Sequence, residues 1–311
     1  MRPEPLSADP SVLLRAATRH TRRGELDVGQ RHASQALAQF HVRGDRDGRM
    51  RTINLLGAIA WERGALAEAE RDFDEAMALA QELGDHVLSA RASNNLASVA
   101  NLRGNPHRAL SLFRNALLEY QRLGDRRGLA ETWHNLGLTW REMGDLMQAD
   151  RAAREAVRHA EQEQDASLLA LAMTGRAEIE LQRGDLRVAE QALARARHLA
   201  AVAGDELGEA EADRIRAILL MRQSDPDQAL AVALAAQTVA ERHGSALLSA
   251  ECAAVAALAA RESSRHEEAE THAATARSGF AALHATQLLS RFDEEWKRGR
   301  PAARSTRIPR D

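Results

Sequence analysis

The stretch at residues 135–156 reads NLGLTWREMGDLMQADRAAREA and places its small residues at regular distances. Gly137 lies seven residues before Gly144, and Ala149 and Ala156 follow five and twelve residues after it. A step of 40 residues from Gly144 leads to further small residues, which are Gly24, Gly64, Gly104, Gly184, Ser224 and Ser264. The neighbouring small positions recur with the same step, so the sequence predicts seven repeats of 40 residues.

Each column of small residues has a physical reason. Glycine adopts the left-handed backbone that ends many helices, and an Asp or Asn after it caps the next helix. Pro106 and Pro226 then stand at a first helical position, where no amide hydrogen is needed. Twenty residues after the first glycine column comes a second, with Gly44, Gly84, Gly124, Gly204 and Gly244. We therefore expect each repeat to be two antiparallel helices, with the alanine columns at their close contacts.

The composition of this 311-residue chain suits a helical protein, because Ala, Leu, Arg and Glu dominate and aromatic residues make up 3%. The net charge of −3 provides no overall basic field, although residues 297–311 carry six basic residues against one acidic residue. Cys252 is the single cysteine, which excludes an internal disulfide and suits a reducing compartment. The first ten residues lack the apolar core of a secretory signal, and the apolar stretches at 229–236 and 252–260 are too short to span a bilayer. We expect a cytoplasmic protein.

The pattern resembles the tetratricopeptide repeat. Trp133, Leu136, Gly137 and Trp140 match the motif of its first helix, and the second-helix motif appears as Ala69, Phe73 and Ala76 and as Ala109, Phe113 and Ala116. The resemblance implies an all-α, right-handed superhelical solenoid of about seven helix–turn–helix repeats with a C-terminal capping helix. The usual repeat has 34 residues. The longer unit is similar to those of Pins-type adaptors, kinesin light chain and maltose-activator-type regulators.

Four segments are expected along the chain. The seven repeats occupy residues 11–283, and a capping helix follows at residues 284–298, where Leu288, Leu289, Phe292 and Trp296 share one face. Residues 1–10 and 299–311 are rich in Pro or Arg with little to bury, so we predict that they are disordered.

The resemblance implies that the first helix of each repeat lines a concave groove. Its inward positions lie six, three and two residues before the small column at Gly57, Ala97 and Gly137, and one, four and five residues after it. In the later repeats these positions are more apolar, with Leu181, Ile215, Ile218, Met221, Val255 and Leu258, and with Glu178 and Arg214 among them. In the earlier repeats they supply the candidate peptide contacts Arg51, Asn54, Trp61, Arg91, Asn94, Asn95, Ser98, Asn101, His134, Asn135 and Arg141.

The asparagines among these candidates point to peptide binding. Asn is a mediocre residue in a helix interior, yet its amide can both donate to and accept from a peptide backbone. Each such hydrogen bond contributes about 0.5–1.5 kcal/mol. Family members that hold peptides with groove asparagines support this interpretation. The alternative is that the amides join neighbouring repeats or face water. Trp61 is either a groove anchor or interhelix packing, whereas Trp133 and Trp140 are expected in the core.

The sequence thus predicts an adaptor or sensor that binds a peptide segment of a partner protein through an Asn/Arg ladder. The alternative is a regulatory or assembly subunit, as in the repeat parts of bacterial transcriptional regulators. It would dimerise or dock through its apolar later repeats, around Ile218, Met221 and Leu258, or through its terminal helix.

Enzymatic, metal and nucleic-acid functions are not expected. The stretch HEEAETH at residues 266–272 differs from the zinc-protease motif, because Glu270 stands where the second histidine is required. The chain has no phosphate-binding glycine loop and no nucleophile elbow. We therefore predict no catalytic residues, no metal ligands and no cofactor.

Overall fold

The periodic glycine and aspartate residues end and begin the helices of the structure, a computed structural model that describes residues 9–22 and 24–298. Gly84 ends one helix with a left-handed φ of 71°, and the carboxylate of Asp85 then accepts a hydrogen bond from the backbone N–H of Leu88 at 2.9 Å. Where the glycine columns hold another residue, that residue adopts the same left-handed backbone conformation, with φ between 52° and 63°. These residues are Gln164, Ser224, Ser264 and His284. Pro106 and Pro226 begin helices, as predicted.

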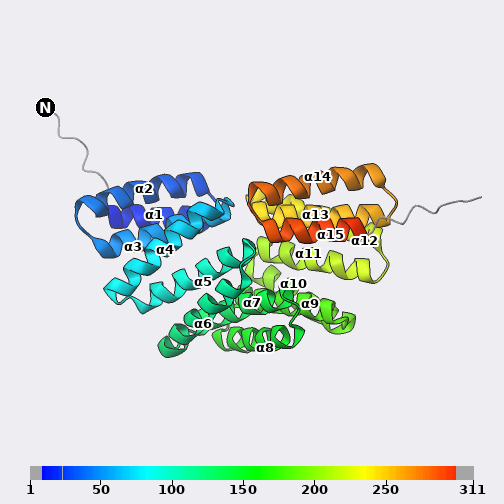
Figure 1. The fold of residues 1–311 in the computed structure, drawn as a ribbon, viewed down its shortest axis with the longest axis horizontal. Helices are drawn as coiled ribbons and strands as arrows, with labels where there is room; N and C mark the ends of the chain where they lie inside the picture. The colour runs from blue at the N-terminus through cyan, green and yellow to red at the C-terminus, as the bar shows by residue number, and fades with distance from the viewer. Residues whose placement is uncertain (1–8, 23, 299–311) are drawn as a thin grey trace, which may run out of the picture.

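The described residues form fifteen α-helices and no strand, which confirms the predicted all-α solenoid (Figure 1). Fourteen helices pair as seven hairpins and the fifteenth follows them. The first four hairpins are α1 (Pro10–Arg22) with α2 (Leu26–Val42), α3 (Arg46–Glu62) with α4 (Leu66–Leu83), α5 (His86–Leu102) with α6 (Pro106–Leu123), and α7 (Arg126–Glu142) with α8 (Leu146–Glu163). The others are α9 (Ala166–Arg183) with α10 (Leu186–Ala203), α11 (Glu206–Arg222) with α12 (Pro226–Arg242), and α13 (Ala246–Glu262) with α14 (His266–Ala282), and α15 (Thr286–Arg298) ends the array.

The small columns lie where helices pack most closely. Alanines at both second-helix positions are completely buried through the array, as at Ala69, Ala76, Ala109 and Ala116. Because helix backbones approach closely there, a larger side chain would overpack the contact at a cost of about 1–3 kcal/mol. Burial of the alanines therefore explains why the smallest residues recur with the period of the fold.

Three tryptophans and the single cysteine pack in or against the core. Trp133 and Trp140 are partly buried against core clusters of the third to fifth hairpins, and Trp61 packs against the cluster around Phe73. Cys252 is fully buried, and its burial raises the pKa of the thiol. The buried thiol therefore belongs to the core.

Helix α15 packs as the predicted capping helix, with Leu288, Phe292 and Trp296 buried. The guanidinium of Arg261 lies 4.6 Å from the centre of the Trp296 ring, and its Nη1 donates to the Trp296 carbonyl at 2.7 Å. Of the segments predicted to be disordered, only residues 9 and 10 are described, and Pro10 begins α1. The rest of residues 1–10 and all of 299–311 lie outside the described residues.

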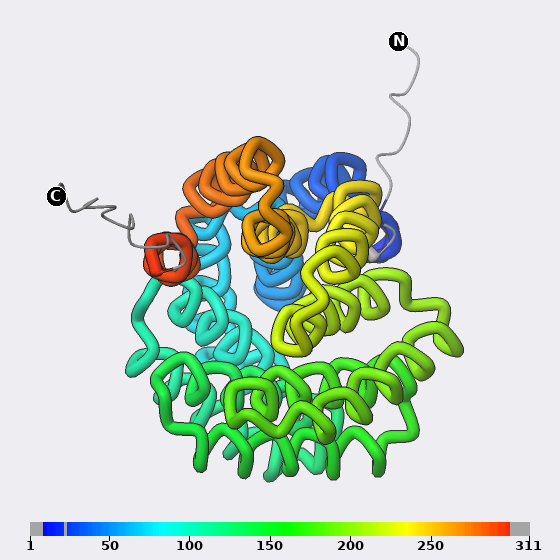
Figure 2. Tube along the Cα trace, turned by 90° about the vertical axis from the view of Figure 1, so that its right-hand side faces the viewer, coloured from blue at the N-terminus to red at the C-terminus, as the bar shows by residue number. Residues whose placement is uncertain are grey.

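The end of the array returns to its beginning, as the end-on view in Figure 2 shows. We call this contact the seam. Leu283, in the turn before α15, lies against Gly64, and Gln287 lies against Gly104. Arg291 Nη1 is 3.7 Å from a carboxylate oxygen of Glu142. The predicted groove is therefore partly enclosed, because α15 lies over the inner faces of helices that are far away in the sequence.

Candidate functional site

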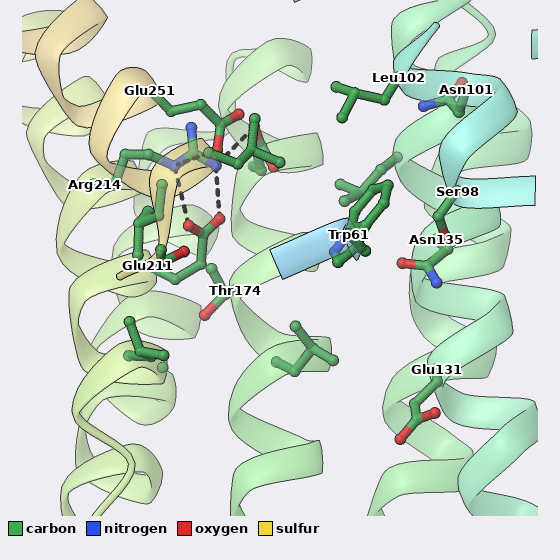
Figure 3. A pocket seen from close by; sticks show the side chains of 18 of the residues that line it. Trp61, Ser98, Asn101, Leu102, Glu131, Asn135, Thr174, Glu211, Arg214 and Glu251 are labelled. Carbon is green, nitrogen blue, oxygen red and sulfur yellow. Dashed lines mark hydrogen bonds and ion pairs between the residues drawn. The ribbon is translucent and has the colours of Figure 1, made fainter. Parts of the chain in front are cut away.

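The first helices of the hairpins surround a central channel with a volume of about 560 Å³. Side chains from α3, α5, α7, α9, α11 and α13 line it, together with Leu288 of α15. Figure 3 shows Arg214, Glu211 and Glu251 on one wall, with Ser98 and Asn135 across from them. The channel is thus the concave surface that the resemblance implied, formed by the helices expected to form it.

The polar wall comes from α5 and α7. Asn101 Nδ2 donates to Glu142 Oε2 at 2.7 Å, while its Oδ1 is buried and accepts no hydrogen bond from the described residues. Asn135 Nδ2 lies 3.5 Å from Asn94 Oδ1 of the preceding repeat. These amides therefore link neighbouring repeats, as the alternative interpretation expects. Asn101 and Asn135 also line the channel, where their contact with a peptide stays a prediction.

The opposite wall is a buried network of charges. Arg141 of α7 forms an ion pair with Glu178 of α9, and Arg214 Nη2 of α11 is 3.6 Å from the same carboxylate. Arg214 also contacts Glu211 at 2.7 Å and Glu251 of α13 at 3.8 Å. Because the side chains of Arg141 and Arg214 are only 8% and 6% exposed, loss of either would leave buried carboxylates without compensation.

Burial and charge shift the pKa values of these carboxyl groups in opposite directions. Burial acts to raise the pKa of Glu178, but the charges of Arg141 and Arg214 outweigh it and lower the pKa to about 2. Burial raises the pKa of Glu251 to about 7, against the charge of Arg214 and with the support of the Glu211 and Glu178 carboxylates. The network therefore holds Glu178 ionised and leaves Glu251 short of positive charge.

The structure brings five of the eleven predicted contact residues together around the channel. These are Trp61, Ser98, Asn101, Asn135 and Arg141. Their inward positions on three consecutive first helices place them on one surface. As contacts to a ligand they stay predictions.

The other six predicted residues lie outside this lining. Arg51 is exposed and pairs with Asp47 and Asp85, and Arg91 lies in a separate pocket beside Tyr120. His134 lies against Gly175 of the next repeat, and burial lowers its pKa to about 4. Asn94 is 7% exposed, and Asn54 and Asn95 are partly buried.

Several lining residues escaped the sequence interpretation, and a signal for them was present. The inward positions of the fourth repeat hold Glu131, and those of the later repeats hold Leu171, Thr174, Glu211 and Glu251. All five occupy the columns six or three residues before the small column. A charged residue at such a position in an otherwise apolar helix, such as Glu251 in LLSAECAAVAAL, indicates a lined cavity.

A second chamber of about 610 Å³ lies between α9, α11, α13 and α15. Its apolar walls come from Leu181, Ile218, Met221, Val255 and Leu258. The apolar residues predicted to mediate dimerisation or docking therefore line a chamber bounded by α15. Arg141, Glu178, Arg214 and Glu251 line both the channel and this chamber, so they form a shared wall.

The described residues also bear on metal binding and on membrane insertion. They contain no group of three or more His, Cys, Asp or Glu side chains placed to hold a metal ion. None of the described helices combines the length and apolar character needed to cross a membrane.

Helical hairpins that stack in sequence order around a lined channel define an α-solenoid. The sequence model of the tetratricopeptide repeat matches residues 48–117 and 88–162. Residues 48–162 therefore consist of tetratricopeptide repeats, and the same 40-residue spacing continues through the hairpins on either side of them. In a search of curated proteins, no sequence matches it.

Three solved structures illustrate the similarity of the fold. The apo form of RapI has a TM-score of 0.67 at 13% identity, over 88% of this chain and 98% of its own. NprR in complex with its cognate peptide NprX has a TM-score of 0.67 at 11% identity, over 95% and 88%. The Rap conjugation gene regulator of plasmid pLS20 in complex with the Phr* peptide has a TM-score of 0.68 at 15% identity, over 91% and 74%.

Proposed function

We propose that this protein is a non-catalytic, cytoplasmic sensor or adaptor that binds a short peptide segment of a partner in its channel. The observation that carries the proposal is the channel itself, with amide groups on one wall and fixed charges on the other. Its volume of about 560 Å³ is within the usual range of ligand sites. Proteins of the same fold, NprR and the pLS20 Rap regulator, have been solved with peptides bound.

Binding fits the lining better than catalysis does. The carboxylates of Glu178 and Glu211 are paired with arginines, which suits fixed recognition rather than proton transfer. In this proposal Ser98, Asn101 and Asn135 would hold the peptide backbone, and Arg141 would keep the facing wall in place.

A substitution that fills the channel tests the proposal. Leu171 lines the channel, so Leu171→Trp should abolish the retention of peptides from a randomised octapeptide display library. Leu118→Trp is the matched control, because Leu118 is 55% exposed and does not line the channel. Retention of the same peptides by the parent protein and by Leu171→Trp would contradict the proposal.

The ladder is tested with a peptide recovered in that selection. Asn135→Ala should weaken its binding by about three- to tenfold, because one net hydrogen bond is lost. Asn95→Ala removes an amide from the same column one repeat earlier, outside the channel lining, and should leave the affinity unchanged. Equal effects of the two substitutions, measured by calorimetry, would remove the ladder from the proposal.

The alternative, a regulatory or assembly subunit that dimerises or docks through its apolar later repeats, has less support. Ile218, Met221 and Leu258 line the second chamber beside α15, so they do not form a free outer surface. Light scattering of the purified protein measures whether it dimerises.

A further inference from the structure

The shared wall between the channel and the second chamber presents a different chemistry on each side. On the channel side the lining contains seven carboxyl groups against three arginines, and no lysine. On the chamber side Met221, Leu258 and Ile218 supply an apolar surface, and the five glutamates and five arginines of that lining balance in charge. A ligand beside this wall would therefore meet an excess of negative charge on one side, and on the other an apolar surface among balanced charges.

Arg214 does not compensate all the carboxylates that surround it. It is shared among Glu211 at 2.7 Å, Glu178 at 3.6 Å and Glu251 at 3.8 Å. Glu251 is beyond hydrogen-bond distance of Arg214 and receives no hydrogen bond from any other described residue. The raised pKa of Glu251 has the same cause, which is burial among carboxylates with too little positive charge.

The facing wall adds a hydrogen-bond acceptor without a donor. Asn101 uses its Nδ2 for Glu142, and its buried Oδ1 has no partner among the described residues. Buried acceptors normally receive a hydrogen bond. Both walls therefore offer acceptors, and the excess of carboxylates in the lining favours a donor with positive charge.

We infer that the channel selects a peptide in which a lysine or arginine lies beside, or one residue from, a bulky apolar residue. The cationic group pairs with Glu211 and Glu251, and the apolar side chain enters the second chamber against Met221 and Leu258. Both side chains come from one short segment, because the same wall lines both spaces and an extended chain advances only about 3.4 Å per residue. The inference rests on the proposed function, since it specifies the chemistry of the segment bound there.

The test measures residue preferences in a randomised octapeptide display library. In peptides retained by the parent protein, we expect Lys or Arg within two positions of Leu, Ile, Met or Phe to be enriched about tenfold. In Glu211→Gln combined with Glu251→Gln, the basic preference should fall below about twofold while the apolar preference stays. Met221→Trp fills the second chamber, so the apolar preference should fall while the basic preference stays.

The control is Glu163→Gln, which removes an exposed carboxyl group outside the lining and should change neither preference. If the double variant shows no thermal unfolding transition, the single Glu211→Gln gives the same readout, because that side chain is 30% exposed.

The two proposals fail in different ways. If the parent and Leu171→Trp retain peptides equally, the proposed function fails. If the parent retains peptides through its channel without a basic and apolar preference, or with preferences that the variants leave unchanged, the inference alone is overturned.

Discussion

Glu251 is a buried carboxyl group whose charge is only partly balanced. Arg214 and Arg291 lower its pKa, whereas burial and the carboxylates of Glu211 and Glu178 raise it from the ordinary value of 4.5 to about 7. The folded protein therefore binds a proton at Glu251 between pH 4.5 and pH 7 that the unfolded chain releases. The folded state gains stability from this proton as the pH falls through that window.

The substitution Glu251→Gln should remove this dependence on pH. Between pH 8 and pH 5 the free energy of unfolding of the parent should rise relative to that of the variant by about 1–3 kcal/mol. Urea unfolding at several pH values measures the difference. Glu163→Gln, on the exposed end of α8, should instead differ from the parent by a constant amount. A constant difference for Glu251→Gln would contradict the unbalanced charge.

Individual side chains also show what a sequence pattern leaves open. Asn94 and Asn135 occupy different inward columns in neighbouring repeats, yet Asn135 Nδ2 lies 3.5 Å from Asn94 Oδ1. His134 shares the column of Asn94 but packs against Gly175. The pattern predicts which helix face a residue occupies. The direction of its side chain depends on the size of its neighbour in the next repeat.

Helical elements could be predicted more fully than side chains. The glycine and aspartate columns place the helix ends, because a left-handed residue stops one helix and a carboxylate caps the next. The six inward columns hold 16 of the 24 first-helix residues that line the channel, including Glu211 and Glu251. These two were missed because the asparagines of the earlier repeats were weighted above charges in the apolar later ones.

Helix α15 depends on one aromatic anchor. Trp296 is 5% exposed, and Arg261 both covers its ring and binds its carbonyl. Trp296→Ala should weaken the docking of α15 by about 3–5 kcal/mol through the loss of buried surface. Amide hydrogen exchange should therefore speed up in α15 and leave α8 and α10 unchanged.

Lys297→Ala provides the control for this prediction, because Lys297 is exposed on the same helix. Exchange in α15 should match the parent in that variant. Full protection of α15 in Trp296→Ala would show that the helix is held by other contacts.

The seam is a property of the whole molecule. Gly64 and Leu283 lie at opposite ends of the array, and their contact depends on the summed rotation of every repeat between them. A small change in rotation per repeat would separate the two ends. For this reason the seam could not be predicted from the sequence, whereas the individual repeats could.

A matched pair of glycine substitutions tests the seam. Gly64 and Gly84 have nearly equal left-handed φ angles of 72° and 71°, so Gly64→Leu and Gly84→Leu carry similar backbone strain of about 1–2 kcal/mol. A Cβ at Gly64 would lie 1.6 Å from Leu283 Cδ2, whereas a Cβ at Gly84 has no neighbour within 4 Å. Small-angle X-ray scattering should show a larger radius of gyration for Gly64→Leu only. Equal radii would contradict the seam.

The contact between the two ends of the superhelix also has a kinetic consequence. Under the proposed function, an internal loop of a folded partner would have to pass the seam, which requires Leu283 and Gly64 to separate, whereas a free peptide terminus would not. The association rate of such a loop would level off at the opening rate as its concentration increases, whereas that of a short free peptide would keep rising. The seam would thus allow the protein to distinguish between partners by topology, in addition to charge and shape.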